Sequence, residues 1–324
     1  MDTFIRPTPK GSEKSLLFFR DYQFYTGGHQ KVADYFSHLN SAPGFMPFIS
    51  FSPESISRTA TPWQSLAAEQ LVRYCPDQYD YLFIAGMDWQ QLKGVARSPN
   101  QPVINLIQHV RHANPQEPLF EFLSEPAIRI CVSHEAQQAL EATGRVHGPI
   151  VSIANGHGIL PVNAPEKIWD LLILGPKNPA VAAQLQLALK SSGLKICCVD
   201  SFIPRQDLAN KMAASRIALL LPHATEGFYL PALEAMAYCD ICIVPDCVGN
   251  RSFCFNQENC LLPEYNVPAL LAALVQAQAL LQQPLALATM RARIHETLAK
   301  HSLMRERQEF LALMAQVDEL WREL

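Results

Sequence analysis

Short apolar runs alternate with amphipathic segments along most of this chain, and this alternation is the feature that most constrains its fold. In the first half, apolar runs of strand length occupy residues 15–19, 47–51, 81–85, 103–107, 128–132 and 150–153. Helical spacing of apolar residues occurs between them, at 30–39, 63–74, 118–123 and 135–142. Strands separated by helices pair in parallel through crossover connections. The first half is therefore predicted to form an open α/β sheet.

A second alternating series follows an Asn-, Gly- and Pro-rich passage at 155–165. Its predicted strands are 170–174, 195–199, 217–221 and 241–244, and its predicted helices are 180–189, 206–214 and 231–237. From Val267 to Leu324 the pattern is helical, with a pause near 301–302. The passage at 155–165 is the best domain boundary. Two such α/β domains place a cleft between the carboxyl ends of their sheets, where ligands of these sheets bind.

Charge and composition exclude several classes of protein. The 324 residues are 49% hydrophobic and carry a net charge of −4, so no overall basic field favours nucleic acid. The apolar run at 16–19 is too short for a signal peptide or a membrane span. We expect a soluble cytoplasmic protein whose contact with membranes is peripheral at most.

Nine cysteines, an odd number, lie partly inside apolar runs, which is typical of buried thiols in a reducing compartment. Cys239 and Cys242 form a C-x-x-C pair that could suggest zinc. However, residues 241–244 are a predicted strand, and strand residues three apart point to opposite faces. We expect structural cysteines and no metal.

Two loops of the first half carry residues that could contact a ligand. Gly27 and Gly28 precede the first predicted helix, where glycines permit close approach and helix N–H groups face an anion. Their spacing is not that of a dinucleotide-binding fingerprint, and an ordinary strand-to-helix turn is the alternative. His109 directly follows a predicted buried strand, so it faces the ligand crevice or simply caps a surface loop.

The stretch from Pro222 to Leu262 carries the strongest signal. Glu226 and Glu234 stand eight positions apart, separated by a turn and by Pro231, which suits the first turn of a helix. A carboxylate there can accept both hydroxyls of a ribose, while loop N–H groups bind phosphate or sugar. Favourable placement of acids at a helix start explains Glu234 without a ligand, but not the whole pattern. Lys177, after the first strand of this half, could place a cation beside a phosphate or simply be a surface lysine.

These residues resemble a known family. Glu226-Gly-Phe-Tyr-Leu-Pro-Ala-Leu-Glu234-Ala-Met-Ala is similar to the E-G-F-G-L-P-x-L-E-A-M-A signature of retaining glycosyltransferases of family 4, which have the GT-B fold. Weaker matches extend the resemblance over most of the chain: 131–133, 153–156, 241–249 and 259–262. Gly27, Gly28 and His109 fall where the family keeps its glycine loop and its cleft histidine.

The resemblance implies two Rossmann-like doubly wound domains that face a central cleft. An acceptor-side domain would span 1–158 and a nucleotide-sugar-binding domain 159–302, with a final helix, 303–324, crossing back to the first domain. The implied activity is sugar transfer with retention from a UDP- or GDP-linked donor to a glycan, glycolipid or small-molecule acceptor. No metal and no cofactor beyond this donor are implied, and the sequence holds no D-x-D motif.

The resemblance also implies roles for individual residues. His109 and Glu226 would be catalytic, and His29 would lie on the acceptor side with loops 52–62 and 87–91. Donor binding is implied for Gly27, Gly28, Lys177, Gly227, Phe228, Tyr229, Leu230 and Glu234.

Two departures from the family pattern affect this site. Tyr229 replaces the second glycine of E-G-F-G, so the loop must avoid positive φ or accept strain. The family's arginine for the diphosphate is missing beside Lys177, and Arg205 or Arg251 could replace it. These departures keep two alternatives open: a catalytically silent GT-B binding or assembly protein, and a nucleotide-sugar epimerase or phosphorylase.

Overall fold

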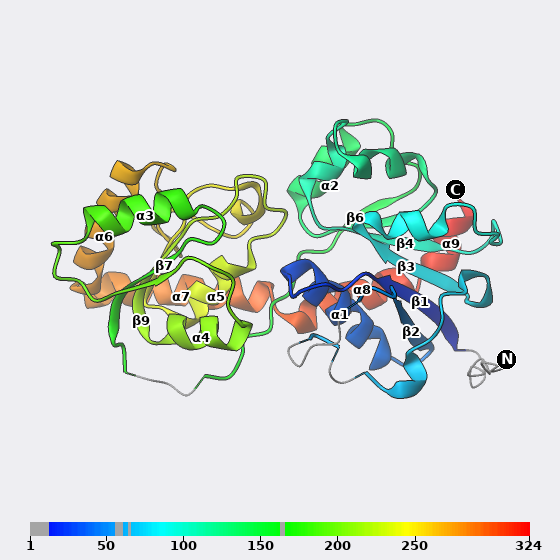
Figure 1. The fold of residues 1–324 in the computed structure, drawn as a ribbon, viewed down its shortest axis with the longest axis horizontal. Coiled ribbons are helices and arrows are strands. Elements are labelled where there is room, and N and C mark those ends of the chain that lie inside the picture. The colour runs from blue at the N-terminus through cyan, green and yellow to red at the C-terminus, as the bar shows by residue number, and fades with distance from the viewer. Residues whose placement is uncertain (1–12, 56–60, 64–65, 163–165) are drawn as a thin grey trace. The chain divides into compact units, whose positions relative to one another are not determined.

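The computed structural model describes residues 13–55, 61–63, 66–162 and 166–324, which form two compact units (Figure 1). The first unit comprises Met1–Asn155 and Met304–Leu324, and the second comprises Gly156–Leu303. The boundaries expected from the sequence were 158 and 302. Parts of the predicted loop at 52–62, the predicted helix at 63–74 and the boundary passage at 155–165 lie outside the described residues.

The first unit is built on a six-stranded sheet in the order β2-β1-β3-β4-β5-β6, and every pairing is parallel. The strands are β1 (Lys14–Arg20), β2 (Phe45–Phe51), β3 (Tyr81–Ala85), β4 (Val103–Ile107), β5 (Ile128–Cys131) and β6 (Ile150–Ser152). The central strands β3 and β4 are buried along their whole length. Continuous burial is typical of parallel strands covered on both faces.

Four α-helices belong to the described part of this unit: α1 (Gly27–Asn40), α2 (His134–Glu141), α8 (Leu303–Met314, whose first residue is assigned to the second unit) and α9 (Val317–Arg322). Short 3₁₀ helices complete it: η1 (Ala68–Gln70), η2 (Pro76–Gln78), η3 (Gly86–Leu92), η4 (Val110–Ala113) and η5 (Pro118–Ser124). The late helix α8 packs on the early part of the chain, since the Phe310 ring meets the Tyr35 ring edge-on at 4.7 Å. The last helical segment is thus part of the first unit's core.

A buried ionic cluster also joins α8 to α1. The Glu306 carboxylate lies 2.6 Å from the Lys31 ammonium and 2.9 Å from His38 Nε2, and Lys31 also contacts Asp34 at 2.8 Å. The Lys31 and Glu306 side chains are 2% and 0% exposed. Charges removed from water this completely are retained only when they are paired.

The helix predicted over 63–74 is wrong. Among its described residues only Ala68–Gln70 form a helical turn, and Leu71 then bridges to Ile49 beside β2. The Gln70 amide donates to the Pro47 carbonyl at 3.2 Å, and Val72 N donates to the Ile49 carbonyl at 2.9 Å. Apolar spacing suited a helix here, but hydrogen bonds to β2 hold the chain extended.

The helix predicted over 118–123 is a 3₁₀ helix, η5. Its carbonyls at Phe122 and Leu123 accept hydrogen bonds from the buried Arg129 guanidinium, at 2.9 and 3.0 Å. A carbonyl at a helix end that accepts a hydrogen bond from a side chain does not need the N–H of a further helical turn, so the helix can stop there. The sequence pattern located the element and missed its type.

The second unit has a four-stranded parallel sheet in the order β10-β9-β7-β8. Its strands are β7 (Trp169–Leu174), β8 (Ile196–Val199), β9 (Ser215–Leu220) and β10 (Ile241–Ile243). Its helices are α3 (Pro179–Ala188), α4 (Arg205–Ala213), α5 (Leu230–Tyr238), the 3₁₀ helix η6 (Val248–Asn250), α6 (Val267–Leu281) and α7 (Pro284–Lys300). Each predicted strand and helix of this unit up to 244 lies within two residues of an observed one.

The C-terminal helical region contains more breaks than the sequence indicated. The expected pause near 301–302 separates α7 from α8, and further breaks follow Leu281 and Met314. Pro284 begins α7 and explains the first of these breaks, because proline cannot continue a helix from the preceding turn. Within the described residues, no single helix has the length and apolar content of a membrane span; α6 and α7, bent by 108° at their break, meet that composition only together.

Candidate donor site

The loops that follow β7, β8 and β9 all leave the same edge of the second sheet, because the three strands run parallel. Lys177 and Glu226 lie on the loops after β7 and β9, Arg205 begins α4 where the loop after β8 ends, and α5 adds Glu234 in its first turns. The second unit therefore gathers two cations and two carboxylates at the carboxyl ends of its strands. This edge is where ligands of open α/β sheets bind.

Lys177 and Glu226 form one ion pair of this group. The Lys177 ammonium donates to the Glu226 carboxylate, and the two side chains are 36% and 12% exposed. The same ammonium lies 5.7 Å from the centre of the Tyr229 ring, within reach of a cation–π contact. His223 N also donates to Glu226, at 3.4 Å. Glu226 is thus oriented from two sides.

Arg205 and Glu234 form the second pair. Arg205 begins α4, and its Nε lies 2.9 Å from Glu234 Oε1. Its Nη2 donates to the Gly158 carbonyl at 2.6 Å, which fixes the guanidinium from the other side. Burial raises the pKa of Glu234, while the charge and hydrogen bond of Arg205 lower it. Glu234, the residue expected to bind ribose, is therefore already paired with the Arg205 guanidinium. The sequence did not predict this contact.

Tyr229 fits its loop without strain. Its φ is −91° and its ψ is 75°, so the loop avoids the positive φ that a glycine would have allowed. Its N–H donates to the Gly249 carbonyl at 2.8 Å. Burial, and then the charge of Glu226, raise the pKa of the Tyr229 phenol well above its ordinary value. Tyr229 is a neutral buried ring under Lys177 rather than a break in the motif.

The loop between Glu226 and α5 packs tightly against η6. Gly227 and Tyr229 are buried, and Leu230 begins α5. The centre of the Phe228 ring lies 4.9 Å from the centre of the Phe253 ring and 5.6 Å from the centre of the His301 ring. These aromatic contacts hold the backbone between the two glutamates in one position.

Gly249 makes this packing possible, and Gly249→Ala tests it. A Cβ at this position would lie 2.7 Å from Phe228 N and 2.8 Å from the Glu226 carbonyl. Both neighbours are backbone atoms, so the loop must shift; we expect a loss of about 1–3 kcal/mol in the free energy of unfolding, measured by urea titration. Gly193→Ala is the control for destabilisation alone: its φ of +75° strains an alanine, but its Cβ would meet nothing within 4 Å and the residue lies between α3 and β8, outside this loop. Equal effects of both substitutions on ligand binding at this edge would contradict this role for Gly249.

Arg251, the other proposed phosphate contact, lies in an exposed ion pair. Its Nε and Nη2 donate to the two Asp246 carboxylate oxygens at 2.9 and 2.6 Å. The pair follows β10, and the side chains are 52% and 60% exposed. Of the two arginines suggested by the sequence, Arg205 is the one beside Glu234.

The glycine loop of the first unit has a structural explanation of its own. Gly27 begins α1, and the Thr26 side chain caps the helix by accepting from His29 N at 3.2 Å. The Gln108 amide donates to the Gly28 carbonyl at 3.0 Å, and a Cβ on Gly28 would lie 2.4 Å from Gln108 Oε1. Gly28 therefore lets the loop after β4 approach α1. His109, next along that loop, precedes η4.

His29 belongs to a polar cluster that the sequence did not reveal. Arg20, the last residue of β1, lies 2.9 Å from the Asp88 carboxylate and 3.1 Å from His29 Nδ1. Arginine has only donors, so His29 Nδ1 accepts and its Nε2 carries the proton. Burial, and then the Arg20 charge, lower the pKa of His29 to about 4, while burial raises the pKa of Asp88 to about 6.

The His29 ring is expected to stay neutral between pH 5 and pH 8 in an NMR titration of its imidazole. Between pH 6.5 and pH 4, His29 of the unfolded chain binds a proton and His29 of the folded chain does not. Acidification over this range therefore lowers the stability of the folded protein through this group. Asp88 acts in the opposite sense, because folded Asp88 accepts its proton first, between pH 6 and pH 4. Arg20→Gln should raise the pKa of His29. A wild-type pKa near 6.5 would contradict the contact.

No metal cluster accompanies either group of residues in the described part of the chain, where no three metal-ligating side chains converge. All nine cysteines are free thiols. Cys239 ends α5 instead of lying on a strand, and its Sγ donates to the Met212 carbonyl at 3.2 Å. Cys242 lies in β10 and is buried.

The structure brings the predicted donor residues of the second unit together and leaves the others in the first unit. Residues 159–279 match the family model described as glycosyl transferases group 1. Solved glycosyltransferase structures superpose on 94% of this chain with TM-scores between 0.65 and 0.68. The chain has the GT-B fold.

Three solved structures illustrate the GT-B likeness. Sucrose-phosphate synthase from Thermosynechococcus elongatus is 14% identical with a TM-score of 0.68, covering 94% of this chain and 99% of its own. Anabaena HepE in complex with UDP-glucose is 12% identical with a TM-score of 0.67, covering 94% and 100%. A glycosyltransferase from Rickettsia africae is 13% identical with a TM-score of 0.65, covering 94% and 98%. No curated protein sequence matches the chain.

Proposed function

We propose that this GT-B protein is a retaining glycosyltransferase. It moves a sugar from a UDP- or GDP-linked donor to a glycan, glycolipid or small-molecule acceptor, in the cytoplasm and without a metal ion. The observation that supports this proposal most is the pair of carboxylates, Glu226 and Glu234. Each lies beside a cation at the carboxyl ends of the strands of the second sheet. The group 1 match over 159–279 covers both, and the similar Anabaena HepE was solved with UDP-glucose.

The donor would be recognised by exchange of partners at this edge. Glu234 would accept the two ribose hydroxyls, and Glu226 would accept hydroxyls of the transferred sugar. The diphosphate would draw the Lys177 ammonium from Glu226, since a doubly charged anion attracts it more strongly than a single carboxylate. The backbone of Gly227, Phe228 and Leu230 would supply further contacts.

Transfer breaks the bond between the anomeric carbon and the diphosphate oxygen, and the electron pair leaves with the diphosphate. Lys177 would stabilise the negative charge on that leaving group, a preorganised electrostatic role. Gly27 and Gly28 would add N–H groups, and His109 would hydrogen-bond the sugar as positive charge develops on it. The acceptor hydroxyl then forms the new glycosidic bond and its proton passes to the departing diphosphate oxygen, with His29 on the acceptor side.

One observation favours a second candidate, a catalytically silent GT-B binding protein. Glu234 is already paired with Arg205, whose guanidinium is also fixed to the Gly158 carbonyl. If Arg205 does not release Glu234, the ribose cannot bind as proposed. An epimerase or phosphorylase would use the same donor site and differ only in its products.

A thermal-shift panel of UDP- and GDP-sugars, followed by NMR analysis of products, tests these candidates. A ligand that binds the native state raises the melting temperature according to its occupancy. The transferase predicts a shift with at least one donor and a new glycoside, or slow release of free sugar, with the original anomeric configuration. A panel with neither binding nor turnover sinks the proposal. Binding without turnover supports the silent protein, and conversion of the donor into an epimeric nucleotide sugar without an acceptor supports an epimerase.

A further inference from the structure

The helices α3 and α6 differ from the other helices of the second unit because they carry no charged side chain. They lie together on one side of β7, and α4 lies on the other side (Figure 1). They are 10 and 15 residues long and contain no Asp, Glu, Lys or Arg, although 17% of the chain is charged. Every other α-helix of the described residues contains at least one charged residue. A helix with one side in water normally carries its charges on that side.

Hydrogen bonds tie the beginnings of these two helices to each other. Asn178, which precedes α3, donates from Nδ2 to the Tyr265 hydroxyl at 3.3 Å, and Tyr265 lies just before α6. The Tyr265 hydroxyl in turn donates to the Pro222 carbonyl, after β9, at 2.7 Å. Leu187 and Val275 are each the ninth residue of their helix, so each lies about 12 Å along its helix from these tied ends.

The solvent-facing side of this helix pair is apolar. Leu187 is 74% exposed and Val275 is 65% exposed. Exposed alanines one or two helical turns away lie on the same sides of the two helices: Ala180 and Ala183 on α3, and Ala272 and Ala279 on α6. The other exposed residues of both helices are proline, alanine and glutamine. Single exposed apolar residues need no explanation, but an uncharged face built from two neighbouring helices is typical of an interaction surface.

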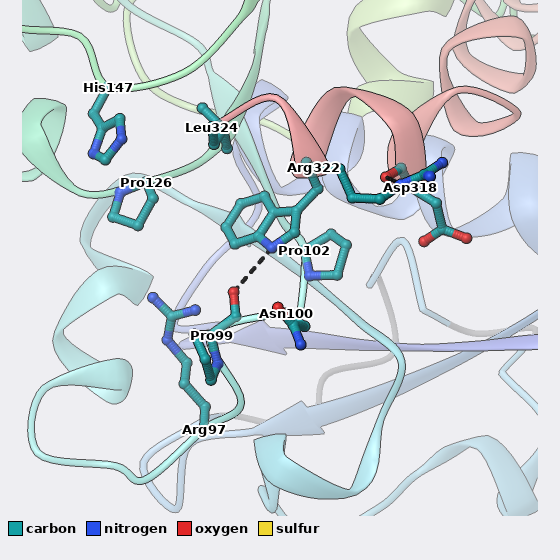
Figure 2. Close-up of a pocket in the computed structure, with 10 residues that line it drawn as sticks. Arg97, Pro99, Asn100, Pro102, Pro126, His147, Asp318, Arg322 and Leu324 are labelled. Atoms are coloured by element: carbon teal, nitrogen blue, oxygen red, sulfur yellow. Dashed lines mark hydrogen bonds between the residues drawn. The ribbon is translucent and has the colours of Figure 1, made fainter.

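The pocket beside Trp321 in the first unit has the opposite character. Its volume is about 970 Å³, and charged side chains of both signs, Arg97, Asp318 and Arg322, are among the residues that line it (Figure 2). The Trp321 indole N–H donates to the Pro99 carbonyl at 3.0 Å, and Arg322 Nε donates to the Asp318 carbonyl at 2.9 Å. An apolar partner would remove these charges from water, so this pocket is not a surface for apolar docking.

The chemistry of the face formed by α3 and α6 limits what can cover it. Nucleic acids and acidic proteins are bound by Lys and Arg, and basic proteins by Asp and Glu. Helices that lie in a membrane interface carry Lys or Arg on their polar side and are often anchored by aromatic residues. Neither helix contains any of these residue types. An uncharged face is complemented by another uncharged face, and a second copy of this chain supplies one.

We propose that α3 and α6 form a docking face for a second copy of this chain, in a two-fold dimer in which this face meets itself. A two-fold interface places the same residues on both subunits, so it needs no second kind of surface. Two neighbouring helices of these lengths present roughly 400 Å² per copy, about half of what a standard interface buries per partner. The dimer is therefore weak, with a dissociation constant in the micromolar range. This inference does not depend on the proposed sugar transfer.

Sedimentation equilibrium of the full chain at concentrations up to about 200 µM tests the proposal. We expect a reversible dimer. The double variant Leu187→Glu with Val275→Glu should raise its dissociation constant by roughly a hundredfold or more, because like charges would then meet in a desolvated interface. A wild type that stays monomeric throughout would overturn the proposal, as would a dimer that survives the double variant.

Met304→Glu is the matched control, because Met304 is 69% exposed and belongs to the first unit. Its dissociation constant should equal that of the wild type. A second double variant, Leu187→Lys with Val275→Lys, should also be monomeric alone and should associate when mixed with the glutamate variant, since opposite charges would then face each other. A mixture that stays monomeric would show that this face meets a different surface and would reject the two-fold arrangement.

Vesicles of phosphatidylcholine and phosphatidylglycerol distinguish a lipid surface from a second copy. We expect the wild type not to sediment with them through this face. Sedimentation with vesicles that the glutamate variant loses would assign the face to lipid and overturn the proposal. Circular dichroism and melting curves check that each variant is folded, which is expected because both substituted side chains are exposed.

Discussion

Glu234→Ala is expected to weaken nucleotide-sugar binding by roughly a hundredfold or more. In the proposed complex the Glu234 carboxylate accepts two ribose hydroxyls, and hydrogen bonds to charged groups contribute about 1.5–3 kcal/mol each. The substitution also leaves the Arg205 guanidinium without its carboxylate partner, which now lies 2.9 Å away. The measurement is the calorimetric Kd of whichever nucleotide sugar shifts the melting temperature most.

Glu258→Ala provides a matched control, because Glu258 is an exposed acid of the same unit. Its binding constant should equal that of the wild type. Glu234→Gln keeps the side chain's shape and one carbonyl acceptor, so its affinity for the nucleotide sugar should lie between those of the wild type and Glu234→Ala. Wild-type affinity in Glu234→Ala would show that ribose is bound elsewhere and would remove the main support for the proposed donor site.

Arg205 makes this result informative about mechanism as well as affinity. If Arg205 must leave Glu234 before ribose binds, Arg205→Ala removes the competition for Glu234. It also leaves the Glu234 carboxylate, 11% exposed, without its cationic partner. If Arg205 instead swings to the diphosphate, Arg205→Ala loses both affinity and turnover. Unchanged turnover with altered affinity would assign Arg205 to positioning Glu234 alone.

The second unit was predictable because its local signals agree with one another. Buried parallel strands such as β7 and β9 are continuous apolar runs, and Pro231 lies in the first turn of α5 where proline is favoured. The spacing of Glu226 and Glu234 then follows from a loop and a helix start of fixed length. Periodicity and turn chemistry are properties of neighbouring residues, so a sequence displays them directly.

What could not be predicted depends on contacts between residues far apart in sequence. Arg205 meets Glu234 across 29 positions and Lys177 meets Glu226 across 49, and no local pattern encodes either pair. Apolar spacing likewise predicted a helix at 63–74, yet Val72 N pairs with the Ile49 carbonyl instead. Tertiary hydrogen bonds override weak local preferences.

Glu306→Ala is expected to lower the free energy of unfolding by about 3–5 kcal/mol, the usual cost of removing one partner of a buried ion pair. The Lys31 ammonium, 2% exposed, would lose the carboxylate at 2.6 Å while keeping Asp34 at 2.8 Å, and His38 would lose the carboxylate at 2.9 Å. Urea unfolding followed by tryptophan fluorescence measures the change, because Trp63, Trp89 and Trp321 all belong to the first unit.

Glu309→Ala on the same helix is the control. Glu309 pairs with Arg305 at 2.9 Å, but both side chains are well exposed, at 38% and 56%. An exposed pair four residues apart on a helix contributes only about 0.3–0.5 kcal/mol. A comparable loss in both variants would mean that burial of the Glu306 cluster is not what fastens α8 to α1.

The double variant Lys31→Met with Glu306→Leu separates charge from packing. It removes the Lys31 and Glu306 charges together and keeps apolar volume between the two helices, while Asp34, 13% exposed, keeps the hydrogen bond from the Gln30 amide at 2.8 Å. It should therefore recover most of the stability lost in Glu306→Ala. Full recovery would show that the cluster adds little net stability and is costly only when broken. The segment after Leu303 would then be fastened mainly by apolar contacts such as Phe310 on Tyr35, with the ion pairs fixing which helix faces meet.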